Sequence, residues 1–159
     1  MREMTTENTV YVTYIATTPE KLWTALTSSA FTTQFFFGAS VESDWKVGSP
    51  WQLRMPNGQV QVKGEVREST PPRRLMVSWL VNAGGDFHKF PECFVSYEIE
   101  PMGNDVVRLT MIEAHPTPIA ADLLKGGRDG WPRILSGLKS LLETGKPLNI
   151  PVPQPPKEM

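Results

Sequence analysis

The sequence has little of several residue types and patterns on which whole classes of protein depend. One cysteine, Cys93, occurs in 159 residues, so no internal disulfide can form, and we expect a reducing, cytoplasmic location. The 16 Lys and Arg residues nearly balance the 17 Asp and Glu residues, so the basic surface that binds nucleic acid is not expected. No run approaches the ~20 apolar residues of a membrane-spanning helix, so we expect no membrane insertion.

Motifs for catalysis and for cofactor binding are also missing. No serine lies in a nucleophile elbow, and no glycine-rich phosphate loop follows a strand-like segment. The two histidines, His88 and His115, are far apart in the sequence and give no metal-ligand spacing. The motifs therefore predict no catalytic residue, no cofactor and no metal site, and they leave open whether the protein is an enzyme.

A strongly amphipathic segment, Gly130–Gly145, lies near the C-terminal end of the sequence. A helix there would bury its apolar side against a large apolar surface. That side is one stripe at helical spacing, formed by Trp131, Ile134, Leu135, Leu138, Leu141 and Leu142.

The ends of this helix can be predicted from capping residues. Asp129 is a candidate N-cap, Pro132 fits the first turn, and Gly145 is typical of a helix stop. Just upstream, Ile119–Lys125 is expected to form a separate helical turn that ends at Gly126-Gly127.

The N-terminal part predicts two short helices. Thr18 is a candidate N-cap with Pro19 in the first turn, and Ser29–Phe35 follows as a second helix or turn.

Seven segments are rich in β-branched and aromatic residues and are expected to be strands. Asn57-Gly58 between two of them predicts a type I′ hairpin, and Gly64 is interpreted as a β-bulge. Strands in succession followed by one helix favour an α+β fold in which a curved antiparallel sheet covers the helix. The segments are Val10–Ile15, Ala39–Trp45, Pro50–Met55, Val60–Val66, Arg73–Val81, Cys93–Glu100 and Val106–Ala114.

Two groups of titratable residues are candidates for chemistry. Glu113 and His115 share one face of an extended segment, where a carboxylate could orient an imidazole as a general base; alternatively, both groups are solvated at a strand end. Asp86, His88 and Glu92 lie on or beside a glycine-rich loop, which could gate a ligand.

Five segments together resemble a known family: Thr18–Thr27, Ser43–Trp51, Gly64–Val66 leading to Pro71–Leu75, Ser78-Trp79, and Gly130–Gly145. The chain resembles the Bet v 1-like, START-related (SRPBCC) superfamily and, within it, bacterial proteins similar to the C-terminal domain of the Hsp90 ATPase activator (AHSA1-like). The resemblance implies a helix-grip fold. A seven-stranded antiparallel sheet would wrap around the C-terminal helix, and two small helices would close one end.

The resemblance also implies a cavity between sheet and helix, which in relatives holds lipids, polyketides or other hydrophobic ligands. One departure matters. Many members end the last strand in a Thr-His pair, where this chain has Ile112-Glu113 with His115 two positions later, so no function of that histidine carries over.

The leading hypothesis is therefore the binding of a hydrophobic or amphipathic small molecule in that cavity. Alternatives are a protein-interaction module like the Hsp90 activator domain, with a chaperone partner, and a cyclase- or hydrolase-like enzyme that needs an inward-pointing titratable group. The residues expected to line the cavity are Trp23, Phe35, Trp51, Trp79, Tyr97, Met111, Glu113, His115, Trp131, Leu135 and Leu138.

We expect residues 1–146 to form a single domain and residues 147–159 to form a proline-rich tail. The tail is either passive or packs through Leu148, Ile150 and Val152 on the body or on the second subunit of a homodimer.

Overall fold

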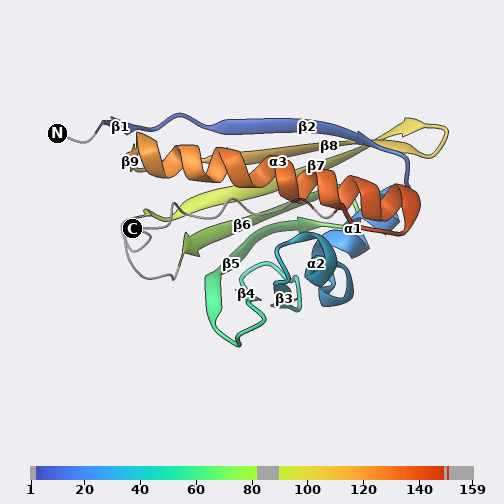
Figure 1. Cartoon of the computed structure of the whole chain (residues 1–159), viewed down its shortest axis with the longest axis horizontal. Coiled ribbons are helices and arrows are strands. Elements are labelled where there is room, and N and C mark those ends of the chain that lie inside the picture. Colours follow the sequence, from blue (N-terminus) through green and yellow to red (C-terminus); the bar gives the residue numbers. More distant parts are fainter. Residues whose placement is uncertain (1–2, 82–89, 149, 151–159) are drawn as a thin grey trace, which may run out of the picture.

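The computed structural model describes residues 3–81, 90–148 and 150 (Figure 1). Seven antiparallel strands form one sheet in the order β2-β8-β7-β6-β5-β4-β3. The strands are β2 (Thr9–Ile15), β3 (Ser40–Ser43), β4 (Pro50–Arg54), β5 (Val60–Thr70), β6 (Arg74–Val81), β7 (Cys93–Gly103) and β8 (Val106–Ala114). Two-residue strands β1 (Met4–Thr5) and β9 (Ile119–Ala120) pair separately, and the helices are α1 (Pro19–Thr27), α2 (Ser29–Phe35) and α3 (Ala121–Thr144).

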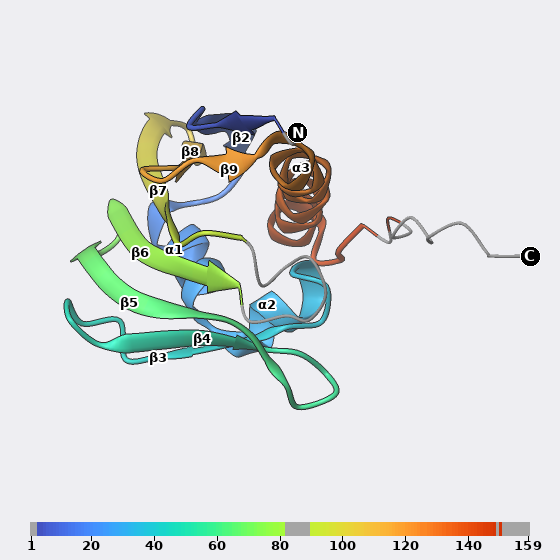
Figure 2. The same cartoon turned by 90° about the vertical axis from the view of Figure 1, so that its left-hand side faces the viewer.

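The sheet curves around α3, and the two short helices close one end (Figure 2). This is the α+β helix-grip arrangement that the sequence predicts, and the prediction is confirmed. The side chain of Thr18 caps α1 by accepting a hydrogen bond from the Lys21 N–H, and α2 has the predicted bounds. Within the described residues, no helix is long and apolar enough to cross a membrane.

Helix α3 is longer than predicted. It begins at Ala121 and continues through Gly126-Gly127, so the expected break there and the Asp129 N-cap are wrong. Each glycine costs about 1 kcal/mol against alanine in a helix, but tertiary packing offsets this cost because Leu124, one turn into α3, is only 2% exposed. The C-terminal end is as predicted: Gly145 has φ 82° and its N–H donates to the Leu141 carbonyl.

Pro132 consequently lies inside α3 and not in its first turn. Proline has no N–H, so the carbonyl oxygen four residues earlier, on Arg128, loses its usual helical donor. The hydroxyl of Tyr11 on β2 donates to that oxygen at 3.3 Å. A side chain of the sheet thus replaces the missing helical hydrogen bond.

The hairpin at Asn57-Gly58 is present, but the predicted type I′ turn is wrong. Of the turn residues, only Gly58 has a positive φ, 90°, and its N–H donates to the Met55 carbonyl. Pro56 holds φ near −65°, which favours an ordinary turn followed by a left-handed glycine. The turn with two successive positive φ values, 53° and 56°, is Asn104-Asp105 between β7 and β8.

Gly64 is not a bulge, because it pairs in register with Trp51. A Cβ atom at this position would lie 1.9 Å from the backbone oxygen of Ser78. That oxygen accepts a 2.7 Å hydrogen bond from the Trp51 indole N–H. The glycine therefore permits a close approach between neighbouring strands.

The tail residues that were proposed to pack differ in exposure. Leu148 is 52% exposed and so does not pack on the body of its own chain, whereas Ile150 is half-buried. Val152 lies outside the described residues.

Candidate functional site

A pocket of about 390 Å³ lies between α3 and the sheet. Its walls are mostly apolar. Phe36 and Phe37 follow α2 at one side, and the sheet contributes Leu53, Met55, Val62, Trp79 and Val81. The N-terminal half of α3 supplies Leu123, Gly126, Gly127, Gly130, Trp131 and Ile134.

One wall is a cluster of aromatic rings from β4, β6, α3 and the residue after α2. The Trp79 and Trp131 ring centroids are 5.5 Å apart, and Phe36 meets Trp131 edge-on at 5.7 Å. Trp51 backs Trp79 at 5.1 Å. These rings are inclined to one another by 41° to 85° and provide a large apolar surface for a ligand.

Among the described residues that line this pocket, Glu113 is the one with a charged side chain, and it is only 3% exposed. It continues the inward-facing row of β8, in which Val107, Leu109 and Met111 are buried at alternate positions. Its Oε1 accepts a 3.0 Å hydrogen bond from the Trp131 indole N–H. Gly127 faces this carboxylate, since a Cβ there would lie in ordinary van der Waals contact, 3.8 Å from both carboxylate oxygens.

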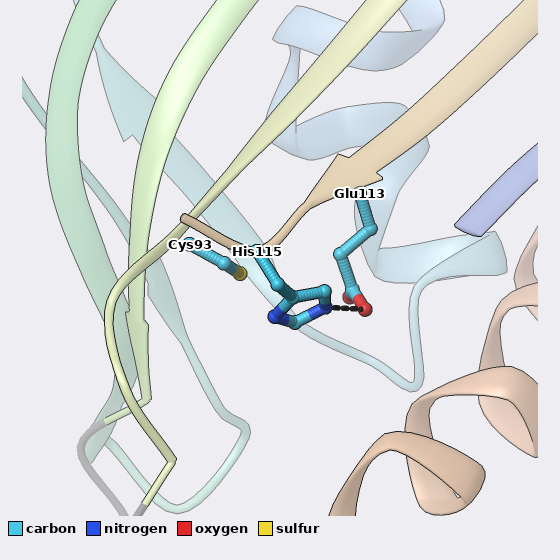
Figure 3. A group of neighbouring side chains, drawn as sticks. All are labelled: Cys93, Glu113 and His115. Carbon is cyan, nitrogen blue, oxygen red and sulfur yellow. Dashed lines mark hydrogen bonds and ion pairs between the residues drawn. The ribbon is translucent and has the colours of Figure 1, made fainter. Parts of the chain in front are cut away.

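His115 is also buried, with a side chain that is 0% exposed. Its Nε2 lies 2.7 Å from Glu113 Oε2 (Figure 3), and its backbone N–H donates to Asn8 Oδ1. The interpretation of both groups as solvated is therefore wrong, because strand β8 keeps its inward register to its end. The arrangement instead matches the alternative, a carboxylate that orients an imidazole.

The Glu113 carboxylate affects the titration of its neighbours. Burial, and secondly the negative charge of Glu113, raise the pKa values of the Tyr97 hydroxyl and the Cys93 thiol far above their ordinary values. The pKa of Tyr11 is raised by the same two causes. All three groups stay protonated at neutral pH, and the site favours hydrogen-bond donors or cations over anions.

The structure brings together only some of the residues that the sequence proposed. Trp79, Glu113 and Trp131 line the pocket, and Trp51 and Tyr97 line an adjacent void of about 20 Å³. Six of the proposed residues line neither space: Trp23, Phe35, Met111, His115, Leu135 and Leu138. The ring of Phe90, which lines the pocket, lies against His115 with centroids 6.1 Å apart.

Of the three loop candidates, only Glu92 belongs to the described residues. Asp86 and His88 lie outside the described residues, and Glu92 is exposed. The enzyme hypothesis requires an inward-pointing titratable group, and Glu113 and His115 fulfil that condition.

The predicted lining omits most of the residues that line this pocket, among them Phe37 and the glycines Gly126, Gly127 and Gly130. The three glycines extend the apolar stripe of α3 toward its start, because Gly127 precedes Trp131 by one helical turn. Phe37 has a positive φ of 51°, which a sequence does not reveal for a phenylalanine. For the three glycines, their spacing relative to Trp131 was therefore the available sequence signal.

Most of the chain matches a known protein family. Residues 16–143 match the model of a family described as Activator of Hsp90 ATPase homolog 1-like protein. Among curated proteins, none matches the sequence significantly.

Solved structures with the same fold include three that cover most of both chains. Protein MLL2253 from Mesorhizobium loti has 23% identity and a TM-score of 0.72, covering 86% of this chain and 96% of its own. The Aha1 dimer from Colwellia psychrerythraea has 20% identity and a TM-score of 0.70, covering 88% and 98%. PFC0360w, an HSP90 activator from Plasmodium falciparum, has 21% identity and a TM-score of 0.69, covering 85% and 95%.

Proposed function

Because the chain belongs to the family of Activator of Hsp90 ATPase homolog 1-like proteins, we propose that it uses the helix-grip fold to bind an amphipathic small molecule between sheet and α3. One observation carries this proposal: an apolar pocket of about 390 Å³ with one buried carboxylate, that of Glu113, in its wall. Pockets of this size, with few and well-placed polar groups, are typical of small-molecule sites.

The apolar walls of the pocket and the Glu113 carboxylate would contact different parts of the ligand. Burying apolar ligand surface against Trp79, Trp131 and Phe36 contributes about 25 cal/mol per Å², less the cost of ordering the ligand. A hydroxyl or amine on the ligand would donate to the Glu113 carboxylate, whose Oε1 already accepts from the Trp131 indole and whose Oε2 lies 2.7 Å from His115 Nε2. An anionic headgroup in the same place would be repelled.

Native mass spectrometry of freshly purified protein tests the proposal, together with thermal shifts in the presence of fatty acids, sterols and aromatic polyketides. We expect a copurified ligand, or a shift with neutral or cationic amphipaths that exceeds the shift with fatty acids of equal length. The absence of both would contradict the proposal.

A substitution that narrows the pocket provides a sharper test. Gly126 lines the pocket and has open space where a Cβ would be, so Gly126→Leu adds bulk to the pocket while raising helix propensity. Lys125→Leu, on the neighbouring exposed position of α3, is the matched control. Ligand binding should fall in the first variant and persist in the second.

A second candidate function is that of a co-chaperone-like module. Support comes from the family match and from the likeness to the Plasmodium falciparum HSP90 activator. The likeness to the Colwellia psychrerythraea Aha1 dimer supports a homodimer as part of the same proposal. A chaperone of the Hsp90 class, assayed for ATPase rate with and without the protein, tests it, and an unchanged rate with no complex in a pull-down would contradict it.

We propose that residues 1–146 carry the function and that the protein acts in the cytoplasm. A chain truncated after Lys146 should bind ligand as the full chain does.

A further inference from the structure

Three side chains with different donor atoms meet beside the pocket: Cys93 on β7, and Glu113 and His115 at the end of β8. A sulfur, a carboxylate oxygen and a ring nitrogen from these residues all lie within 4.8 Å of one another. Strand pairing creates this group, because Phe94 lies opposite Ala114 and the adjacent positions therefore bring Cys93 toward His115. The spacing in the sequence does not indicate it.

All three side chains are withdrawn from solvent. Cys93 is 0% exposed, and Glu113 and His115 are each 3% exposed. Buried charged and polar groups normally have partners, since an unpaired one costs about 1–3 kcal/mol.

His115 has an unsatisfied atom within this group. Its Nε2 pairs with Glu113, but its Nδ1 has no hydrogen-bond partner among the described residues. Figure 3 shows the ring between the carboxylate and the sulfur, with Nδ1 on the side of Cys93. An imidazole nitrogen that is buried, unpaired and turned toward a thiol is placed as a metal ligand would be.

We infer that Cys93, Glu113 and His115 form a binding site for a zinc ion. Zn²⁺ accepts sulfur, nitrogen and oxygen donors together, and three protein ligands leave a fourth position open. Zinc binding would displace the proton of the Cys93 thiol, and the resulting thiolate and the Glu113 carboxylate carry two negative charges, which a divalent ion neutralises within a buried site. A hard ion such as Mg²⁺ would avoid the sulfur.

Zinc binding requires the three side chains to close and to reorient. Zinc–ligand distances of about 2.0–2.3 Å place tetrahedral ligand atoms roughly 3.5 Å apart, and the donors begin within 4.8 Å. Because Glu113 Oε2 pairs with Nε2 while the unpaired Nδ1 is the other ring nitrogen, the imidazole or the carboxylate must also turn before both meet the same ion. The Trp131 indole N–H, which already donates to Glu113 Oε1, would hold the carboxylate while Oε2 turns to the metal.

A spectroscopic titration of the full chain tests the site. Co²⁺, which takes the place of zinc, should bind with a 1:1 stoichiometry and give a thiolate-to-cobalt charge-transfer band. Cys93→Ser should abolish the band, and Glu113→Gln should weaken binding at least about tenfold. Glu92→Gln, an exposed neighbour of Cys93, is the control that should leave both unchanged.

A second measurement needs no variant. Cys93 is the sole cysteine of the chain, so a thiol reagent reports on this position alone. Zn²⁺ should slow labelling of the native protein at least about tenfold, and Mg²⁺ should not. Binding of Co²⁺ without the charge-transfer band, or an unchanged labelling rate with Zn²⁺, would overturn the inference, whatever ligand the neighbouring pocket holds.

Discussion

Glu113 on the sheet and Trp131 on α3 are joined by a buried hydrogen bond of 3.0 Å between the carboxylate Oε1 and the indole N–H. Both residues line the pocket. The contact therefore fixes the first half of α3 over the sheet and orients the carboxylate at the same time.

Trp131→Phe should lower the free energy of unfolding by about 1–3 kcal/mol, because it leaves a buried carboxylate oxygen without its donor. Urea unfolding measures this loss. Trp23→Phe, at a partly buried position on α1, is the control and should cost less. A double-mutant cycle with Glu113→Gln should give a coupling of about 0.5–3 kcal/mol, and additive losses would show that the contact contributes nothing.

Glycine substitutions should have opposite effects at two positions. Gly64→Ala should destabilise the protein by about 3 kcal/mol, because the new Cβ would lie 1.9 Å from the Ser78 oxygen. Gly126→Ala should stabilise it by about 1 kcal/mol, because nothing lies within 4 Å of that Cβ in the described structure. Thermal unfolding compares the two, and equal effects would contradict the assigned role of Gly64.

The stability of the protein should depend on pH through Glu143. Its Oε2 accepts hydrogen bonds from Lys139 Nζ at 2.7 Å and from the Ala16 N–H at 2.8 Å. The Lys139 contact first, and then the Ala16 contact, hold the pKa of Glu143 below its ordinary value.

A lowered pKa in the folded state means that the stabilisation is present above the ordinary glutamate pKa and is lost as the pH falls through the folded-state pKa. Glu143→Ala should therefore cost about 1 kcal/mol at pH 7, and the difference from the wild type should shrink toward pH 3. Urea unfolding at both pH values measures it, and a difference that grows on acidification would have the wrong sign.

Local signals were enough to predict most of the fold. The N-cap Thr18, the second helix Ser29–Phe35 and the stop at Gly145 each depend on residues within one or two turns, and all three are observed. The start of α3 was mispredicted because the cost of Gly126-Gly127 is local, whereas the packing of Leu124 that offsets it is tertiary.

The candidate site was harder to predict for the same reason. The alternation of Val107, Leu109 and Met111 could have placed Glu113 on the buried face, but its position near a strand end left that open. The proximity of Cys93 to His115 follows only from the pairing of β7 with β8. No spacing within the sequence contains that information.

The central claim, that the pocket beside Glu113 takes up an amphipathic molecule, is tested most directly by titrating the neutral hydrophobic dye Nile red into three proteins. The wild type and Lys125→Leu should bind the dye with equal affinity and enhance its fluorescence. Gly126→Leu should bind it at least about tenfold more weakly, which corresponds to a loss of at least about 1.4 kcal/mol of binding free energy. Equal binding by all three proteins, or none by the wild type, would contradict the claim.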